Sequence, residues 1–231
     1  MSAAPAIHTV LFDLDGTLTD PKVGITRGVQ HALAGFGIEV EDPETLLAYI
    51  GPPLRDAFVA HHGIAAGDLE AIVARFREYY LPIGLFENQV LPGIPDMLAD
   101  VVALPGVTVA VATAKVDEQA ARVLEHFGLL EHFAFVGGAT WDATRVTKEA
   151  VIAHTLAALD IGPGADERAG VVIVGDREHD VHGAHHERIG AIGVRWGYAA
   201  PGELEAAGAH VIVDEVADLL PVLRGPATWW V

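Results

Sequence analysis

Cysteine is absent from the 231-residue sequence. Disulfides, thiolate catalysis and zinc sites built on thiolates are therefore excluded. Basic residues are also few, because 14 Lys and Arg stand against 32 Asp and Glu and the formal net charge is −18. Nucleic acids and anionic membranes both require basic surface on a partner protein. We therefore expect no nucleic-acid partner and no membrane partner.

Long hydrophobic runs are missing as well. No apolar run approaches the ~20 residues that a membrane span needs, and residues 1–6 lack the basic start and apolar stretch of a signal peptide. The composition is 51% hydrophobic and 20% charged, which is typical of a globular protein. We predict a cytoplasmic protein with one good core and room for a small second lobe, either a monomer or a homodimer.

Several short segments are apolar on both alternating faces, which predicts buried parallel strands. They are residues 7–14, 107–112, 171–174 and 191–194, with 211–213 as a weaker fifth. Helical patterns lie between them, for example at 117–127 and 148–159. Strands that alternate with helices predict an α/β protein with a doubly wound, Rossmann-like parallel sheet.

One interval breaks this alternation. Helical periodicity without a convincing strand occupies residues 21–88, in four stretches at 25–36, 44–50, 54–61 and 68–80. So long a helical interval after the first strand exceeds a simple crossover. We predict a catalytic core made of residues 1–19 and 89–231, with an inserted all-helical domain at 20–88.

Polar residues gather at the ends of the predicted strands, where open α/β sheets bind their ligands. Singly, each has an ordinary structural explanation, since an Asp at a strand end is commonly a turn or a helix cap. Their joint placement at equivalent strand ends favours a functional site. The set consists of Asp13, Asp15, Thr113, Ala114, Lys115, Asp176 and Asp180, with Lys148 at the start of a helix.

This set suits phosphate chemistry. Clustered carboxylates repel one another unless a hard cation binds them, and Mg²⁺ prefers oxygen ligands. A bound Mg²⁺ attracts a phosphate and shields its charge from an attacking carboxylate. The Thr113 hydroxyl can hold phosphoryl oxygens, and Lys148 adds positive charge where negative charge develops. One of Asp13 and Asp15 can attack phosphorus while the other protonates the leaving oxygen.

The order and context of these residues resemble a known family. Residues 13–20, Thr113, Lys148 and residues 175–180 are similar to the four motifs of the haloacid dehalogenase (HAD) superfamily, and the match spans nearly the whole chain. A helical insert between the first and second motifs resembles the subgroup with a mobile helical cap. Phosphoglycolate-phosphatase-like and 5′-nucleotidase-like members are similar at residues 21–26, 50–55, 84–88 and 136–138.

The resemblance implies a Mg²⁺-dependent phosphatase that hydrolyses a small-molecule phosphate monoester through an aspartyl-phosphate on Asp13. It implies that Asp15 acts as general acid and then as base. It further implies that Mg²⁺ is held by Asp13, the main-chain carbonyl of Asp15, and Asp176, with Asp180 in support. Dehalogenases of the superfamily lack the second aspartate, so its presence favours phosphoryl transfer.

Substrate contacts are predicted at Thr113, Ala114 and Lys148. Arg55 and Lys22 join them, because such positions in the helical insert of the family can face the active site; an exposed ion pair is the equally weighted alternative. Ala114 and Val116 depart from the Ser or Asn and the Pro that relatives usually have, which affects substrate contacts more than the chemistry.

Alternatives stay open at this point. A sugar-phosphate mutase uses the same residues, and a non-catalytic binding or regulatory protein could keep the fold. The substrate is expected to be phosphoglycolate-like or a nucleoside monophosphate. Four histidines form a separate group, which we interpret as a polar helix surface in preference to a second metal site. They are His179, His182, His185 and His186.

Overall fold

The computed structural model describes residues 6–225. Six strands form one parallel sheet in the order β5-β4-β1-β6-β7-β8. From the central β1 the chain builds outward to one side and then to the other, so the predicted doubly wound α/β fold is confirmed. The strands are β1 (Thr9–Phe12), β4 (Thr108–Val116), β5 (Phe135–Ala139), β6 (Val171–Gly175), β7 (Gly190–Val194) and β8 (Val211–Val213).

The five strands expected from the pattern are all present, but β5 was not expected. Its glycines lower strand propensity and interrupt the apolar pattern. Tertiary packing requires them. A Cβ on Gly137 would lie 2.0 Å from Thr155 Oγ1, and one on Gly138 would lie 2.5 Å from the Lys115 carbonyl oxygen. The residues that hide β5 from a sequence pattern are therefore the ones that let it fit at the sheet edge.

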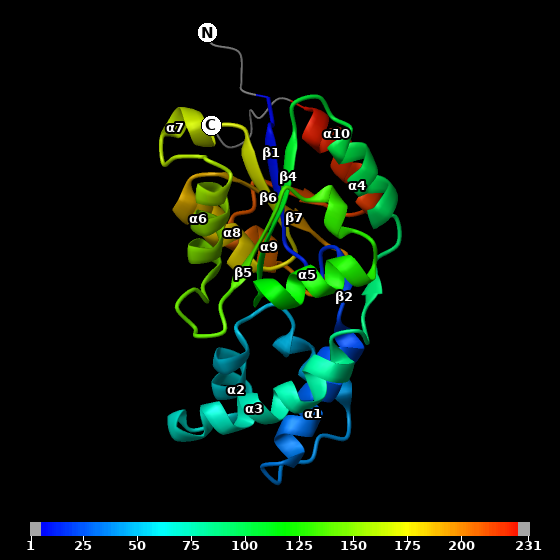
Figure 1. Cartoon of the computed structure of the whole chain (residues 1–231), viewed down its shortest axis with the longest axis vertical. Helices are drawn as coiled ribbons and strands as arrows, with labels where there is room; N and C mark the ends of the chain where they lie inside the picture. The colour runs from blue at the N-terminus through cyan, green and yellow to red at the C-terminus, as the bar shows by residue number, and fades with distance from the viewer. Residues whose placement is uncertain (1–5, 226–231) are drawn as a thin grey trace.

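Helices cover both faces of the sheet (Figure 1). Alternate residues of β1 enter different apolar clusters, since Val10 and Phe12 pack in one and Leu11 in the other. This two-sided burial is the reason for the continuous apolar strands in the sequence. The helices are α4 (Ile94–Val102), α5 (Asp117–His126) and α10 (Val216–Arg224) on one face, and α6 (Lys148–Ala158), α7 (Ala165–Arg168), α8 (Glu178–Glu187) and α9 (Glu203–Ala207) on the other.

The interval after β1 forms a separate group of helices beyond one end of the sheet, in blue to cyan in Figure 1. We call it the helical region. Its apolar residues, among them Val29, Phe58, Ile72 and Phe76, belong to the same buried cluster as one face of the sheet. Its elements are α1 (Lys22–Ala34), the 3₁₀ helix η1 (Pro43–Tyr49), α2 (Leu54–His62), the 3₁₀ turn η2 (Ala66–Asp68), α3 (Leu69–Tyr79) and the π-helical η3 (Tyr80–Gly84).

Two short antiparallel strands connect the helical region to the sheet. They are β2 (Thr19–Asp20) and β3 (Gln89–Val90), with Thr19 opposite Val90. The chain therefore leaves and re-enters the core at one place. A two-residue strand is too short to produce a sequence pattern, which is why neither was expected. Among the helices of residues 6–225, none has the length and apolar character to span a membrane.

Candidate active site

The register of the sheet brings the predicted site residues together. Phe12 at the end of β1 pairs with Val111 of β4 and with Val174 of β6. The residues that follow, Asp13 and the segments beginning at Ala112 and Gly175, therefore reach the same edge. The β4–β5 pairing shifts register between Ala112 and Val116. Such an irregularity re-aims side chains, and it affects the part of β4 that carries Thr113 and Lys115.

The loop after Asp13 turns sharply against β6. Gly16 has a φ of +90°, a conformation that residues with a Cβ rarely adopt. A Cβ at this position would lie 2.3 Å from Asp176 Oδ2. The glycine thus allows the main chain to pass directly beside the Asp176 carboxylate, with Asp15 immediately before the turn. This explains physically why the segment needs glycine after its second aspartate.

Lys148 enters the site from the first turn of α6. The helix begins there because the Thr147 side chain caps it, accepting a hydrogen bond from the Ala150 N–H at 3.4 Å. Lys148 Nζ donates to Asp13 Oδ1 at 2.8 Å and lies 2.6 Å from Asp180 Oδ1. Burial opposes the charge of this ammonium, but the two carboxylates outweigh it and raise the pKa of Lys148. The side chain therefore stays protonated at neutral pH.

Three buried carboxylates crowd around this lysine. Asp13, Asp176 and Asp180 each offer an oxygen within 4.8 Å of the others. Burial, followed by the negative charges of Asp13 and Asp180, raises the pKa of Asp176 well above its ordinary value. Burial likewise raises the pKa of Asp180 to about 6, although Lys148 opposes the shift. One ammonium does not compensate three carboxylates, and a hard cation has the charge and ligand preference that such a cluster needs.

Hydrogen bonds hold two of these carboxylates in place. Asp176 Oδ2 accepts from the Tyr198 N–H at 2.7 Å, and its Oδ1 accepts from the Thr17 hydroxyl at 3.3 Å. Asp180 belongs to the N-terminus of α8, where its Oδ2 accepts from the Arg177 N–H at 3.1 Å. The acidic cluster is thus oriented by the surrounding chain before any ligand arrives.

Asp15 has a different environment from the other acids. Its Oδ2 accepts a hydrogen bond from Lys115 Nζ, while its Oδ1 is buried and has no hydrogen-bond partner among residues 6–225. Burial raises the pKa of Asp15, and Lys115 opposes the rise. A carboxyl with one held oxygen and one free oxygen is suited to exchanging a proton with a ligand.

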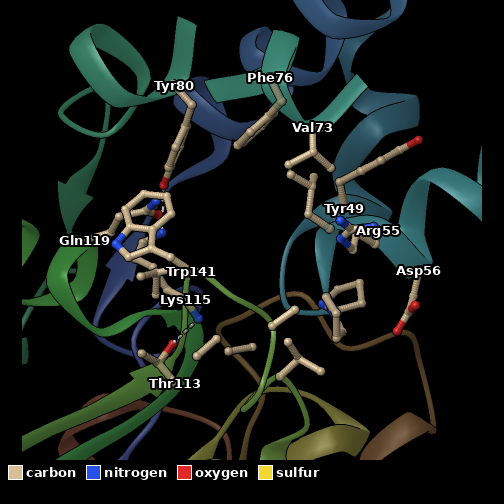
Figure 2. Close-up of a pocket in the computed structure, with 18 of the residues that line it drawn as sticks. Tyr49, Arg55, Asp56, Val73, Phe76, Tyr80, Thr113, Lys115, Gln119 and Trp141 are labelled. Carbon is tan, nitrogen blue, oxygen red and sulfur yellow. Dashed lines mark hydrogen bonds between the residues drawn. The ribbon is translucent and has the colours of Figure 1, made fainter. Parts of the chain in front are cut away.

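A cavity of about 480 Å³ lies between this sheet edge and the helical region. Figure 2 shows Thr113 and Lys115 at its base, Tyr49, Arg55 and Val73 on one wall, and Trp141 and Gln119 on the other. The volume is in the usual range for a small-molecule site. The core side of the lining also includes Asp13, Asp15 and Ala114, and the helical side includes Phe76, Arg77 and Tyr80.

Two predicted substrate contacts in the helical region differ in position. Arg55 lines the cavity, where it forms an ion pair with Glu70. Lys22 lies at the start of α1, outside the lining, and its ammonium pairs with Glu44.

The four histidines of α8 are spread over different neighbours. His179 and His182 line a second cavity of about 190 Å³ beside Lys148. The His185 ring lies 5.0 Å from that of His210, and His186 Nδ1 is 2.9 Å from Glu187 Oε1. In the part of the chain that the structure describes, the group of side chains with metal-ligating spacing is the aspartate cluster.

Sequence reasoning missed several residues of the cavity wall. Val73, Phe76, Arg77 and Tyr80 follow the i, i+3, i+4, i+7 spacing of one helix face, a pattern that is also typical of core packing. Trp141 lies in the loop after β5, a strand that was itself missed. Lys115 belongs to the set expected at the strand ends, but its contacts with Asp15 and Tyr80 were not predicted.

Known proteins with similar sequences support this description of the site. The model of the haloacid dehalogenase-like hydrolase family matches residues 10–194. A 5′-nucleotidase of Pseudomonas aeruginosa is 40% identical over 222 residues, which cover 96% of this chain and 98% of the relative. The tyrosine-protein kinase PtkA of Mycobacterium tuberculosis is 39% identical over 218 residues, covering 92% of this chain and 72% of that protein.

Among solved structures, a predicted phosphatase from Clostridium acetobutylicum superposes with a TM-score of 0.89 at 36% identity, covering 95% of this chain and 99% of that one. This structural match confirms the predicted fold class. The family model confirms the predicted family resemblance, and together with the named relatives it confirms the predicted enzyme class, a phosphatase. The chain belongs to the haloacid dehalogenase-like hydrolase family.

Proposed function

We propose that the chain is a Mg²⁺-dependent phosphatase that hydrolyses a small phosphate monoester through a phosphorylated Asp13. The observation that carries the proposal is the placement of Asp13 and Asp15 together on the floor of one cavity. Asp13 is held by Lys148, whereas Asp15 keeps a free oxygen. This arrangement supports Asp13 as the nucleophile and Asp15 as the proton donor.

The acidic cluster fits a magnesium ion. Asp13, Asp176 and Asp180 supply carboxylate oxygens. Burial, and then the neighbouring carboxylates, raise the pKa values of Asp176 and Asp180, which supports a cation bound among them. We propose that these three residues and the main-chain carbonyl of Asp15 hold the ion. When bound, Mg²⁺ shields the negative charge of the phosphate from the attacking carboxylate.

In the first step, a carboxylate oxygen of Asp13 attacks phosphorus and forms an acyl phosphate. The bond between phosphorus and the ester oxygen breaks, and its electron pair goes to the leaving oxygen. Asp15 gives that oxygen a proton, so the product leaves as an alcohol. Thr113 and Lys148 contribute a hydroxyl and an ammonium beside the developing charge.

In the second step, Asp15 takes a proton from water. The resulting hydroxide attacks phosphorus, the bond to Asp13 breaks, and inorganic phosphate is released. The Asp13 carboxylate and the protonated Asp15 are both restored, so the cycle closes without another reactant.

The residues on the walls of the cavity favour a substrate that is larger than the phosphate group alone. Trp141, Phe76 and Tyr49 offer aromatic surface, and Arg77 adds a guanidinium. We propose that residues 20–88 form a cap over a core of residues 1–19 and 89–231, and that this cap selects the substrate. Aromatic surface near a phosphate site favours a nucleoside monophosphate over the smaller phosphoglycolate, in line with the name 5′-nucleotidase of the P. aeruginosa relative.

The test is a phosphate-release assay with purified protein and Mg²⁺ on nucleoside monophosphates, phosphoglycolate, sugar phosphates and pyrophosphate. We expect release from at least one monoester, loss of release with a chelator, and a phosphorylated Asp13 peptide after acid quenching. Absence of phosphate release across the whole panel would contradict the proposal.

A phosphotransferase is the second candidate. The relatives named as tyrosine-protein kinases support it, and the same Asp13 chemistry would serve a mutase. In this case the phosphoryl group passes to an acceptor other than water. Phosphate release that falls as an added acceptor becomes phosphorylated would favour transfer, and steady release in the presence of acceptors would favour hydrolysis.

A further inference from the structure

Tyr80 connects the helical region to the catalytic floor. It begins η3, the π-helical turn that follows α3, and its side chain is buried. The ring stacks on Phe76, with centroids 4.8 Å apart. Its hydroxyl accepts a hydrogen bond of 2.7 Å from Lys115 Nζ, which belongs to β4 of the sheet. A π turn displaces the side chains that follow it and is frequent at functional sites.

Lys115 joins Tyr80 to Asp15. Its ammonium donates to the Tyr80 hydroxyl on one side and to Asp15 Oδ2 on the other. The lysine side chain is only 4% exposed, so its ammonium depends mainly on these two partners. A buried ammonium is costly unless it is paired and hydrogen-bonded. Loss of the Tyr80 hydroxyl therefore leaves the lysine with one of its two side-chain hydrogen bonds.

The two oxygens of Asp15 are not equivalent in this arrangement. Oδ2 accepts from Lys115 whether or not the carboxyl is protonated, so a transferable proton belongs on Oδ1. That oxygen has no partner among residues 6–225, and Asp15 lines the cavity. Lys115 thus holds the Oδ2 side of the carboxyl and leaves Oδ1 as the oxygen without a protein partner.

We infer that Lys115 and Tyr80 are positioning residues for proton transfer by Asp15. Tyr80 holds Lys115, Lys115 holds Asp15 Oδ2, and Oδ1 is thereby aimed at the leaving oxygen of the substrate. This inference rests on the proposed phosphatase reaction. Because Tyr80 belongs to the helical region and Asp15 to the sheet edge, the proton donor is fully positioned only when the two parts lie against each other.

We expect the effect of losing these contacts to depend on the leaving group of the substrate. An alkyl phosphate expels an alkoxide, which must receive a proton as the bond to phosphorus breaks. Nitrophenolate leaves p-nitrophenyl phosphate as a stable anion and needs no proton. A misplaced Asp15 therefore slows the alkyl ester selectively, whereas general damage to the site slows both substrates.

The principal variant is Tyr80→Phe, which removes the hydroxyl and keeps the ring on Phe76. Tyr79→Phe is a matched control, since the neighbouring Tyr79 hydroxyl donates to Glu87 and the residue is not part of the cavity lining. The substrates are p-nitrophenyl phosphate and an alkyl ester, either adenosine monophosphate or phosphoglycolate, whichever the wild type hydrolyses faster.

We expect Tyr80→Phe to lower kcat on the alkyl ester by about 10-fold to 100-fold, a part of the usual contribution of general acid catalysis. Its KM, and its kcat on p-nitrophenyl phosphate, should change by less than about 3-fold, and Tyr79→Phe should match the wild type on both. Equal loss on both substrates, no loss on either, or a rise confined to KM would overturn the inference.

A second pair of variants tests whether Tyr80 acts through Lys115. Lys115→Gln should cause the larger selective loss, and adding Tyr80→Phe to it should have little further effect, because coupled residues are not additive. If the two substitutions instead lowered kcat independently, so that their effects multiplied in the double variant, Tyr80 would not act through Lys115. A wild-type chain that hydrolyses neither substrate would instead overturn the proposed function and this inference with it, and activity on p-nitrophenyl phosphate alone would count against proton donation by Asp15.

Discussion

The charged side chains at the sheet edge and on the helical wall of the cavity differ in how deeply they are buried. At the sheet edge, Lys148 is 5% exposed and is enclosed by the carboxylates of Asp13 and Asp180. On the helical wall, Arg55 is 38% exposed and its partner Glu70 is 79% exposed. Exposed pairs contribute little to stability and rearrange easily, while buried charges depend strongly on their partners. The charges at the sheet edge are therefore fixed by their buried partners, whereas the Arg55–Glu70 pair on the wall is free to rearrange.

Removal of the nucleophile should produce the largest effect. Asp13→Asn keeps the shape of the side chain but gives a poor nucleophile, and we expect kcat to fall by about 10⁴-fold or more. Circular dichroism should show an unchanged fold, as required if the floor serves chemistry. Substantial turnover by clean variant protein would mean that Asp13 does not form the covalent intermediate.

The acidic cluster should also make metal-free protein sensitive to pH. Carboxyls whose pKa is raised on folding stabilise the protein below their ordinary pKa, near 4, and lose that contribution as pH rises through the folded value, about 6 for Asp180. Urea unfolding with a chelator should show stability falling from pH 4 to pH 8.

Two controls isolate this effect. Asp176→Asn removes one charge from the cluster and should flatten the pH dependence. Added Mg²⁺ should raise the melting temperature more at pH 8 than at pH 5, because the carboxylates are ionised at the higher pH. A pH profile identical in the wild type and in Asp176→Asn would show that the cluster is not the source.

A smaller effect is expected from Arg77 on the helical wall. Its guanidinium lies 5.0 Å from the Trp141 ring centroid and has no carboxylate partner within residues 6–225. Burial, and then the charge of Arg55, lowers the pKa of Arg77. An anionic or hydrogen-bond-accepting group of the substrate would therefore stabilise the charged guanidinium. We expect Arg77→Ala to raise KM by about 10-fold, as for loss of a charged hydrogen bond, with kcat little changed.

Arg75 provides the control for this variant. It lies on the same helix, outside the cavity lining, and pairs with Glu78 at 2.9 Å. Arg75→Ala should keep the wild-type KM on every substrate. A similar rise in KM for both variants would indicate general loss of positive charge and not a contact at Arg77.

The smallest effect is expected at Lys22. Its ammonium faces Glu44 and not the cavity, so Lys22→Ala should leave KM and the urea midpoint close to their wild-type values. Steady-state kinetics on the preferred substrate is the measurement. A marked rise in KM would show that Lys22 reaches the substrate after a movement of the helical region, as the family resemblance implied.

Much of the fold could be predicted from the sequence because buried parallel strands and amphipathic helices impose local periodicity. The five predicted strands are present, and the helices at 117–127 and 148–159 correspond to α5 and α6. The missed strand β5 contains Gly137 and Gly138, whose small size matters only against Thr155 and Lys115 in the folded chain. Local pattern carries no information about such distant neighbours.

The residues of the floor could be predicted because parallel strands end at a common edge, so sequence position at strand ends implies proximity in space. The wall could not be predicted in this way. Tyr80 and Lys115 are 35 residues apart, and Lys115 and Asp15 are 100 apart. Their contacts depend on how the helical region is placed against the sheet, which no spacing within one helix specifies.

The sequence by itself thus determined the doubly wound sheet, the helical insertion and the set of acids and lysine at the strand ends, since each follows from short-range pattern and strand topology. Tertiary structure alone decided that Asp15 has one held and one free oxygen, and that Lys22 faces Glu44 while Arg77 lines the cavity. The physical reason is that burial and the charges of distant segments, not sequence neighbours, set the partner of each side chain.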